Sequence, residues 1–194
     1  QASQSDIVVN AHKIHNGEEV ILDNKSKDFF FLKRYDVNVI WKVLVTLVSQ
    51  KLPRYVDARP QDIQILTPMR KGALGVENLN QILQKYLNPP APDKAERENG
   101  GNILREGDKV MQITNNYDKG VFNGDMGTII AVRHAENSFA VRYDLGEVLY
   151  TFSEADQLAP AYAVTVHKSQ GSEFPAVVMP VLSQHYMMLQ RNLL

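Results

Sequence analysis

The sequence predicts an α/β protein: a parallel sheet with helices on both faces, into which a small antiparallel β-barrel is inserted. Helix-like and strand-like segments alternate up to residue 90, short alternating strands with glycine turns follow, and the α/β pattern returns at Leu158. We therefore expect an α/β domain whose first part is 1–104, a barrel at 105–156, and the second part of the α/β domain at 157–194.

The first two elements are predicted as an amphipathic helix and a buried strand. Residues 3–17 place apolar side chains at helical spacing and end at Gly17, which is a common helix stop. Residues 28–34 are a short aromatic and aliphatic run with polar flanks, which is typical of a buried strand. This pair begins the alternation of helices and strands.

The alternation continues with helix, strand and helix. Asp36 is a good N-cap for the strongly apolar helix 37–52, which Pro53 is expected to end. Residues 62–68 read as a second buried strand, and residues 75–90 as a helix that stops at two prolines. Such an order favours a parallel sheet packed against helices.

Short strands separated by turns replace this pattern after a polar connector at 91–102. The Asn123-Gly124 pair signals a hairpin turn, and Gly127 indicates a bulge or a tight packing point. This spacing favours a small antiparallel barrel. The expected strands are 108–114, 124–134, 138–144 and 147–153.

The α/β pattern then resumes with a strand at 176–181 and a helix that starts at Ser183. That helix stops within its pattern, and the chain begins with Gln1 rather than Met. We therefore expect an excised piece of a longer protein, with no targeting signal to interpret.

Composition indicates an ordinary globular chain. Of the 194 residues, 44% are hydrophobic and 22% are charged, and no apolar run approaches the length of a membrane span. The absence of cysteine excludes disulfides and suits a cytoplasmic location. The net charge of -1 gives no global attraction to nucleic acid, although residues 25–71 carry more basic than acidic side chains.

Several polar groups are candidates for binding. Thr67, Arg70 and Lys71 lie at the end of a predicted strand, where open α/β sheets bind ligands, and would suit phosphate oxygens, although a solvated loop is the favoured alternative for these residues alone. The run Asn115–Tyr117 could hydrogen-bond and stack on bases, although a structural turn is an equal alternative. His12 and His15 have no carboxylate partner at metal-ligand spacing, so no metal site is expected.

The densest set of polar side chains lies in residues 162–174, "YAVTVHKSQGSEF", before an apolar run. Its Thr-x-His-x-x-x-Gly-x-Glu-Phe pattern resembles motif V of superfamily 1 helicases, and its Lys-Ser-Gln form resembles the RecD-like branch, which moves 5′ to 3′ on single-stranded DNA. Residues 1–17, 65–84 and 110–129 are similar to other parts of the same family. The resemblance covers essentially the whole chain.

The resemblance implies a second RecA-like motor domain, 2A, carrying an inserted SH3-like barrel, 2B. It implies that DNA is contacted by residues from three parts of the chain, and that Gly171 and Glu173 face the nucleotide, with the carboxylate near the ribose. The implied DNA contacts are Thr67, Arg70, Asn115, Asn116, Tyr117, Thr165, His167, Lys168, Ser169 and Gln170.

The resemblance also implies what this chain lacks. The sequence has no GxxxxGK[ST] loop, since Lys168-Ser169 is not preceded by the required glycines. ATP and Mg2+ would belong to the full-length parent, with a missing N-terminal motor domain, and an arginine finger would follow Leu194. We therefore expect no complete catalytic site, no bound cofactor and no ATPase activity in this piece alone.

Partners implied by the resemblance are single-stranded DNA, the N-terminal motor domain and subunits of a recombination complex. The piece itself is expected to be monomeric and away from membranes. An alternative from another class is a non-enzymatic nucleic-acid-binding module built on the glycine-rich barrel. A further alternative is a protein-interaction barrel, which would show no salt-dependent DNA binding.

Overall fold

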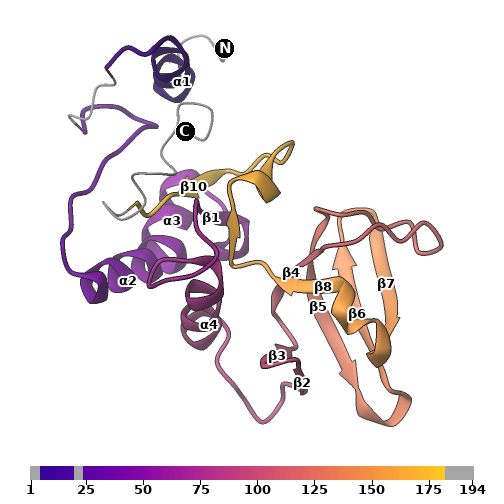
Figure 1. Ribbon diagram of the computed structural model, residues 1–194. Coiled ribbons are helices and arrows are strands. Elements are labelled where there is room, and N and C mark those ends of the chain that lie inside the picture. Colours follow the sequence, from indigo (N-terminus) through magenta and orange to yellow (C-terminus); the bar gives the residue numbers. More distant parts are fainter. Residues whose placement is uncertain (1–4, 20–23, 182–194) are drawn as a thin grey trace.

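The computed structural model describes residues 5–19 and 24–181. The first element is helix α1 (Asp6–Asn16), which starts after Ser5 and ends at Gly17 in the left-handed conformation, as its sequence predicts. Figure 1 shows α1 apart from the other helices. The helix expected from Ser183 lies outside the described residues.

A parallel sheet forms the centre of the α/β part, in the order β10-β1-β9. Strand β1 (Ile63–Thr67) lies between β9 (Ala163–Thr165) and β10 (Ala176–Val178), and both pairings are parallel. Segments on either side of the antiparallel region thus meet in one sheet. The expected α/β class with an inserted antiparallel region is confirmed.

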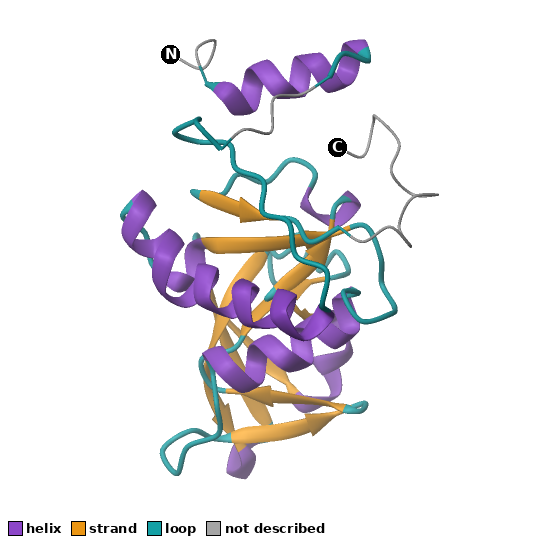
Figure 2. Cartoon of the chain, turned by 90° about the vertical axis from the view of Figure 1, so that its left-hand side faces the viewer, coloured by secondary structure: helices purple, strands orange, loops and turns teal. Residues whose placement is uncertain are grey.

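Helices cover one face of this sheet, as Figure 2 shows. They are α2 (Val37–Thr46), α3 (Leu52–Val56) and α4 (Val76–Leu87). Their apolar side chains share a core with the sheet residues Ile63 and Ile65. Helices were expected on both faces, but within the described residues the opposite face of the sheet packs against the antiparallel region, through Leu66, Val164 and Met111.

The helix expected to end at Pro53 continues to Val56. A π-helical turn, Leu47–Lys51, joins α2 to α3, and the N–H of Leu52 bonds back five residues to the carbonyl of Leu47. Proline lacks an N–H and its ring collides with the carbonyl four residues earlier in a regular helix. The wider turn before Pro53 leaves space for the proline ring. The helix therefore continues through a local change in its hydrogen-bond pattern instead of ending.

The buried strand expected at 28–34 is wrong. This segment pairs with no strand in the described part of the chain, and Phe30, Phe31 and Leu32 are each at least 41% exposed. The backbone of Phe31 instead bonds to the side chain of Asn24. The apolar run therefore lies outside the sheet, and Phe30 packs edge-on against Tyr55 of α3.

The inserted region is a five-stranded antiparallel sheet in the order β7-β6-β5-β4-β8. Its core is one cluster that includes the stacked rings of Phe139 and Tyr150. Within the described residues β7 and β8 form open edges, so the sheet curves without closing into a full barrel. The strands are β4 (Lys109–Gln112), β5 (Met126–Arg133), β6 (Ser138–Tyr143), β7 (Gly146–Thr151) and β8 (Leu158–Pro160).

Two glycine assignments in this sheet are confirmed. Asn123 and Gly124 form the turn before β5. Gly127 is a tight packing point, because an added Cβ would lie 2.6 Å from the carbonyl oxygen of Arg142 on the neighbouring strand.

The polar connector at 91–102 contains a hairpin that its composition does not predict. Strands β2 (Glu96–Asn99) and β3 (Asn102–Arg105) pair across Gly100 and Gly101. Its strands carry few β-branched residues, so tertiary contacts decide its structure. The remaining short helices are the 3-10 turns Pro60–Asp62, His134–Glu136, Phe152–Gln157 and His167–Ser169.

None of the helices in the described ranges is long and apolar enough to cross a membrane.

Candidate nucleic-acid interface

A groove of about 700 Å³ lies where the parallel sheet meets the antiparallel sheet. Its walls come from the loops after β1 and β9 on one side and from the loop before β5 on the other. Apolar side chains such as Met111 and Val164 line it between these walls. The polar lining residues are Arg70, Asn123, Asp125, Thr165, His167, Lys168, Gln170 and Ser172.

The turn after β9 supplies most of the polar lining, as the sequence pattern suggested. His167, Lys168 and Gln170 are exposed, and they lie in or directly after the 3-10 turn His167–Ser169. Ser169 has a different role, because its hydroxyl donates to the carbonyl of Val166 at 2.8 Å. The hydroxyl of Thr165 accepts from the N–H of Lys168. Ser169 and Thr165 therefore hold the turn.

The loop after β1 brings Arg70 to the groove but leaves Thr67 out of it. Thr67 is fully buried, and its hydroxyl donates to the carbonyl of Leu74 at 2.8 Å and accepts from the N–H of Met69. A buried hydroxyl with both roles used acts on the loop that contains it. Thr67 therefore shapes the segment that carries Arg70.

The run Asn115–Tyr117 divides into two structural amides and one exposed ring. Asn115 accepts a hydrogen bond from the backbone of Asn123, while Asn116 bonds to the side chain of Gln157 and the backbone of Lys119. Tyr117 is 77% exposed. The amides therefore hold the loop, and the ring is left accessible.

Two residues near this loop were not among the binding candidates drawn from the sequence. Phe122 lies against Tyr117 with ring centroids 5.5 Å apart, and is itself 42% exposed. Asn123 accepts a hydrogen bond from the ammonium of Lys168 at 3.0 Å, which joins the two walls of the groove. The sequence accounts for Asn123 fully as part of an Asn-Gly turn, so it gave no reason to expect this contact with Lys168.

The two residues assigned to the nucleotide follow the same turn. Gly171 lines the groove with a φ of 83°, and an added Cβ there would meet no atom within 4 Å. Glu173 is exposed, and its neighbour Phe174 lies 5.8 Å from the ammonium of Lys109. Both positions are thus open to a ligand.

Lys109 joins the two sheets at the base of this region. Its ammonium donates to the carbonyl of Gln61 at 2.8 Å. Burial lowers the pKa of Lys109 to about 8, and the nearby carboxylate of Asp62 opposes that shift. The charged form is therefore less favoured in the folded protein than in the unfolded chain.

Stability is expected to rise with pH because of Lys109. Between pH 8 and its ordinary pKa near 10.5, the unfolded chain holds the proton more tightly than the folded one. Relative to a Lys109→Met variant, the parent should gain about 2 kcal/mol in free energy of unfolding from pH 7.5 to pH 10. Urea titrations at both pH values measure this gain, and Lys51→Met, an exposed lysine, is the control. An equal difference at both pH values would contradict it.

Metal-ligating side chains do not gather in the described ranges: no group of three or more histidines or carboxylates there could hold an ion.

Comparison with protein families matches two parts of the chain. Residues 79–143 match the SH3 domain of ATP-dependent RecD-like DNA helicases. Residues 160–194 match the UvrD-like helicase C-terminal domain. The inserted sheet and the returning α/β segment are thus each recognised separately.

Curated relatives match over about two thirds of the chain. The ATP-dependent RecD2 DNA helicase of Deinococcus radiodurans is 39% identical over 138 residues, which is 69% of this chain and 18% of that protein. The RecBCD enzyme subunit RecD of Haemophilus influenzae is 32% identical over 131 residues, or 68% of this chain and 19% of that protein. The chain spans less than a fifth of the length of either relative.

The fold is shared with a solved structure of Pif1 helicase from Bacteroides, in complex with ADP-AlF3 and single-stranded DNA. That likeness has a TM-score of 0.50 at 18% identity, and covers 92% of this chain and 43% of the other. The two family matches define the class of the chain: its parts are a RecD-like helicase SH3 domain and a UvrD-like helicase C-terminal domain. The chain belongs to the RecD-like helicase family.

Proposed function

We propose that this chain is the second motor domain of an ATP-dependent 5′ to 3′ DNA helicase, and that it grips single-stranded DNA in the groove between the two sheets. The observation that carries this proposal is that Arg70, His167 and Lys168 line one groove together with the loop before β5, residues 123–125. Cations and hydrogen-bond donors suit phosphate oxygens, and the apolar lining suits bases.

The three sequence segments would divide as expected, with domain 2A at 1–104 and 157–194 and domain 2B at 105–156. The core of the antiparallel sheet runs from Leu104 to Leu158, so the proposed 2B segment supplies most of that core, and one core residue lies just outside the segment at each end. Direct DNA contacts would come from the exposed residues Arg70, Tyr117, His167, Lys168 and Gln170. Thr67, Asn115, Asn116, Thr165 and Ser169 would act mainly by holding the loops that carry them.

Gly171 and Glu173 would meet the nucleotide at the other end of the same turn. The open space at Gly171 admits a close approach, and the exposed carboxylate of Glu173 can accept a ribose hydroxyl. ATP and Mg2+ in the parent supply phosphoryl-transfer chemistry, and would be held mainly by a preceding motor domain, since this sequence has no GxxxxGK[ST] loop. This piece alone would hold no cofactor and have no ATPase activity.

One short turn would then contact both the DNA and the nucleotide. Thr165 and His167 lie near the sheet end of the turn, and Glu173 lies six residues after His167. A shift of this turn when the nucleotide changes would alter the grip on DNA, which is how opening and closing of two domains can move a strand.

The remaining proposals concern location and partners. The chain would be cytoplasmic and monomeric, and it would contact the preceding motor domain and subunits of a recombination complex.

Binding of fluorescent oligo-dT across a salt titration tests the proposed function. An Arg70→Ala, His167→Ala double variant should bind about tenfold more weakly, because it loses a phosphate-neutralising cation and a donor. Its slope of log affinity against log salt should be shallower by ~0.7, the value for one phosphate on a single strand.

The matched control is an Arg34→Ala, His12→Ala double variant, which removes the same residue types at exposed positions outside the groove. It should bind like the parent. Equal weakening of both double variants would mean that DNA contacts the surface non-specifically, and salt-independent binding would overturn the proposal.

A further inference from the structure

The chain crosses between the α/β part and the antiparallel sheet at two places that lie side by side. It enters the antiparallel sheet through residues 105–109 and leaves through residues 158–163, and the strands at these crossings, β4 and β8, pair with each other. A connection made of two strands alone would let the antiparallel sheet rotate relative to the α/β part. The contacts around Asp108 determine whether it is free to do so.

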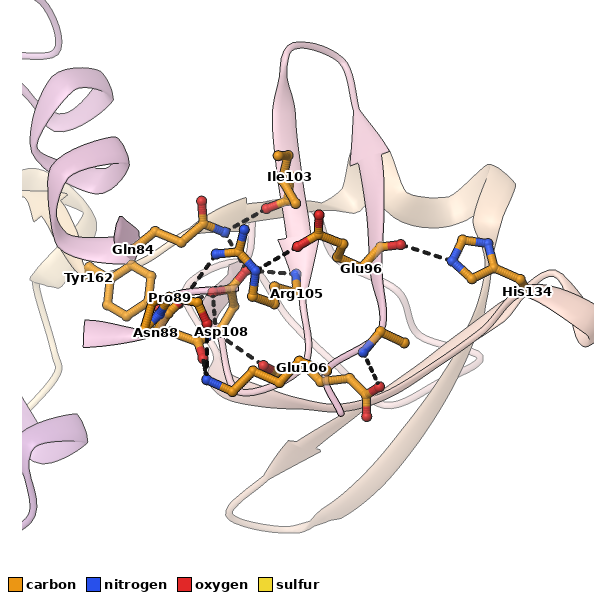
Figure 3. Close-up of polar contacts among 12 residues, drawn as sticks. Gln84, Asn88, Pro89, Glu96, Ile103, Arg105, Glu106, Asp108, His134 and Tyr162 are labelled. Atoms are coloured by element: carbon orange, nitrogen blue, oxygen red, sulfur yellow. Dashed lines mark hydrogen bonds and ion pairs between the residues drawn. The ribbon is translucent and has the colours of Figure 1, made fainter. Parts of the chain in front are cut away.

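The carboxylate of Asp108 accepts four hydrogen bonds in a nearly fully buried position. Gln84 of α4 and Asn88, the C-cap residue of that helix, each donate a side-chain N–H at 2.8 Å. The backbone N–H of Arg105 donates at 2.8 Å and the hydroxyl of Tyr162 at 2.7 Å. Figure 3 shows these groups converging. One side chain therefore ties both crossings to helix α4.

A second set of bonds around Arg105 supports the first. Its guanidinium, on a side chain that is only 5% exposed, donates to the carboxylate of Glu96 at 2.7 Å and to the carbonyl of Asn88 at 2.8 Å. The ammonium of Lys94 donates to the side-chain oxygen of Asn88 at 2.7 Å. The β2–β3 hairpin is thereby joined to the end of α4. We call Gln84, Asn88, Arg105, Asp108 and Tyr162 the interdomain joint.

We propose that the interdomain joint, centred on Asp108, locks the antiparallel sheet in one orientation on the α/β part and thereby sets the geometry of the DNA groove. Both crossings lead directly to groove residues, since β4 begins one residue after Asp108 and contains Met111, and Tyr162 precedes Thr165 by three residues. Asp108 and Tyr162 are positioning residues, because neither lines the groove.

The chemistry of the joint favours a fixed arrangement. A buried carboxylate with four donors loses several bonds at once if either crossing rotates, and the donors would remain shielded from water. Burial first, and then the charge of Asp108, raise the pKa of Tyr162 well above its usual value, so its hydroxyl remains a donor at any physiological pH.

Interspin distances in the 194-residue chain test this inference without DNA. Because the sequence has no native cysteine, spin labels can be placed at Glu77→Cys on α4 and at Leu145→Cys in the antiparallel sheet, both exposed. The parent joint should give one narrow distance distribution. Asp108→Asn, which puts an amide N–H2 among four donors, should at least double its width, and Tyr162→Phe should broaden it less.

A second label pair inside the antiparallel sheet, Asp118→Cys with Leu145→Cys, reports whether that sheet is still folded, and Asp144→Asn is the matched surface control. If the Asp108→Asn variant no longer shows the distance between the two labels inside the antiparallel sheet, that sheet has unfolded. Tyr162→Phe is then the variant that tests the inference. A distribution that is already broad in the parent would overturn the inference, as would one that stays narrow in the deciding variant. The link to the groove rests on the proposed function, whereas the distances do not, so each can fail separately.

Discussion

Replacing Asp108 with alanine is expected to lower the free energy of unfolding by about 4 kcal/mol. The substitution removes the acceptor for Gln84, Asn88, Tyr162 and the N–H of Arg105. Asp108 itself is only 4% exposed. Buried donors without a partner retain the cost of leaving water, and the alanine leaves a small void as well. Urea denaturation at pH 7 measures the loss.

Asp144→Ala is the control for that experiment, because Asp144 is an exposed carboxylate in the turn between β6 and β7. Its effect should stay within about 0.5 kcal/mol. Should Asp108→Ala cost no more than this control, the four hydrogen bonds would contribute nothing net to stability, and the interdomain joint would lose its energetic basis.

Gly75→Ala is expected to destabilise the protein by about 3 kcal/mol and to weaken oligo-dT binding. An added Cβ would lie 2.5 Å from the carbonyl carbon and oxygen of Lys71 and 2.8 Å from the carbonyl carbon of Arg70. These are backbone atoms, so no side-chain rotation relieves the contact. The loop must move, and it carries Arg70, whose carbonyl accepts from the N–H of Glu77 at the start of α4.

Gly101→Ala separates this collision from ordinary glycine strain. Gly101 has a φ of 87° with no atom within 4 Å of an added Cβ, so alanine there should cost about 1 kcal/mol and leave DNA binding unchanged. Chemical denaturation and the oligo-dT titration compare the two variants. Unchanged affinity in Gly75→Ala would show that the loop's position does not matter to binding, even if stability falls.

Local patterns predicted the elements whose stabilising contacts lie close in sequence. The helical spacing and Gly17 stop of α1, the N-cap at Asp36 and the Asn-Gly turn at 123–124 are all present. The 162–174 pattern also placed His167, Lys168 and Gln170 on one exposed turn. In these cases the backbone conformation follows from nearby hydrogen bonds and side-chain type.

The failures share a different cause. Residues 28–34 have the composition of a buried strand, yet no partner strand reaches them in the described part of the chain, and Asn24 takes the backbone bonds of Phe31. Thr67 looked like a ligand residue but faces the carbonyl of Leu74. Strand pairing and burial depend on residues that are close in space but distant in sequence. The composition of one short segment therefore does not determine them.

The amino-acid sequence alone is enough to predict the order of α/β and antiparallel segments, the RecD-like turn at 165–174 and the absence of a GxxxxGK[ST] loop. Other contacts become visible only in the folded protein: Asn123 meets Lys168 across the groove, and Asp108 gathers donors from α4 and its C-cap, from β3 and from Tyr162. Each of those contacts joins residues that are far apart along the chain. Their free energy exists only once the two sheets have folded and packed together, because burial and hydrogen-bond geometry depend on that packing.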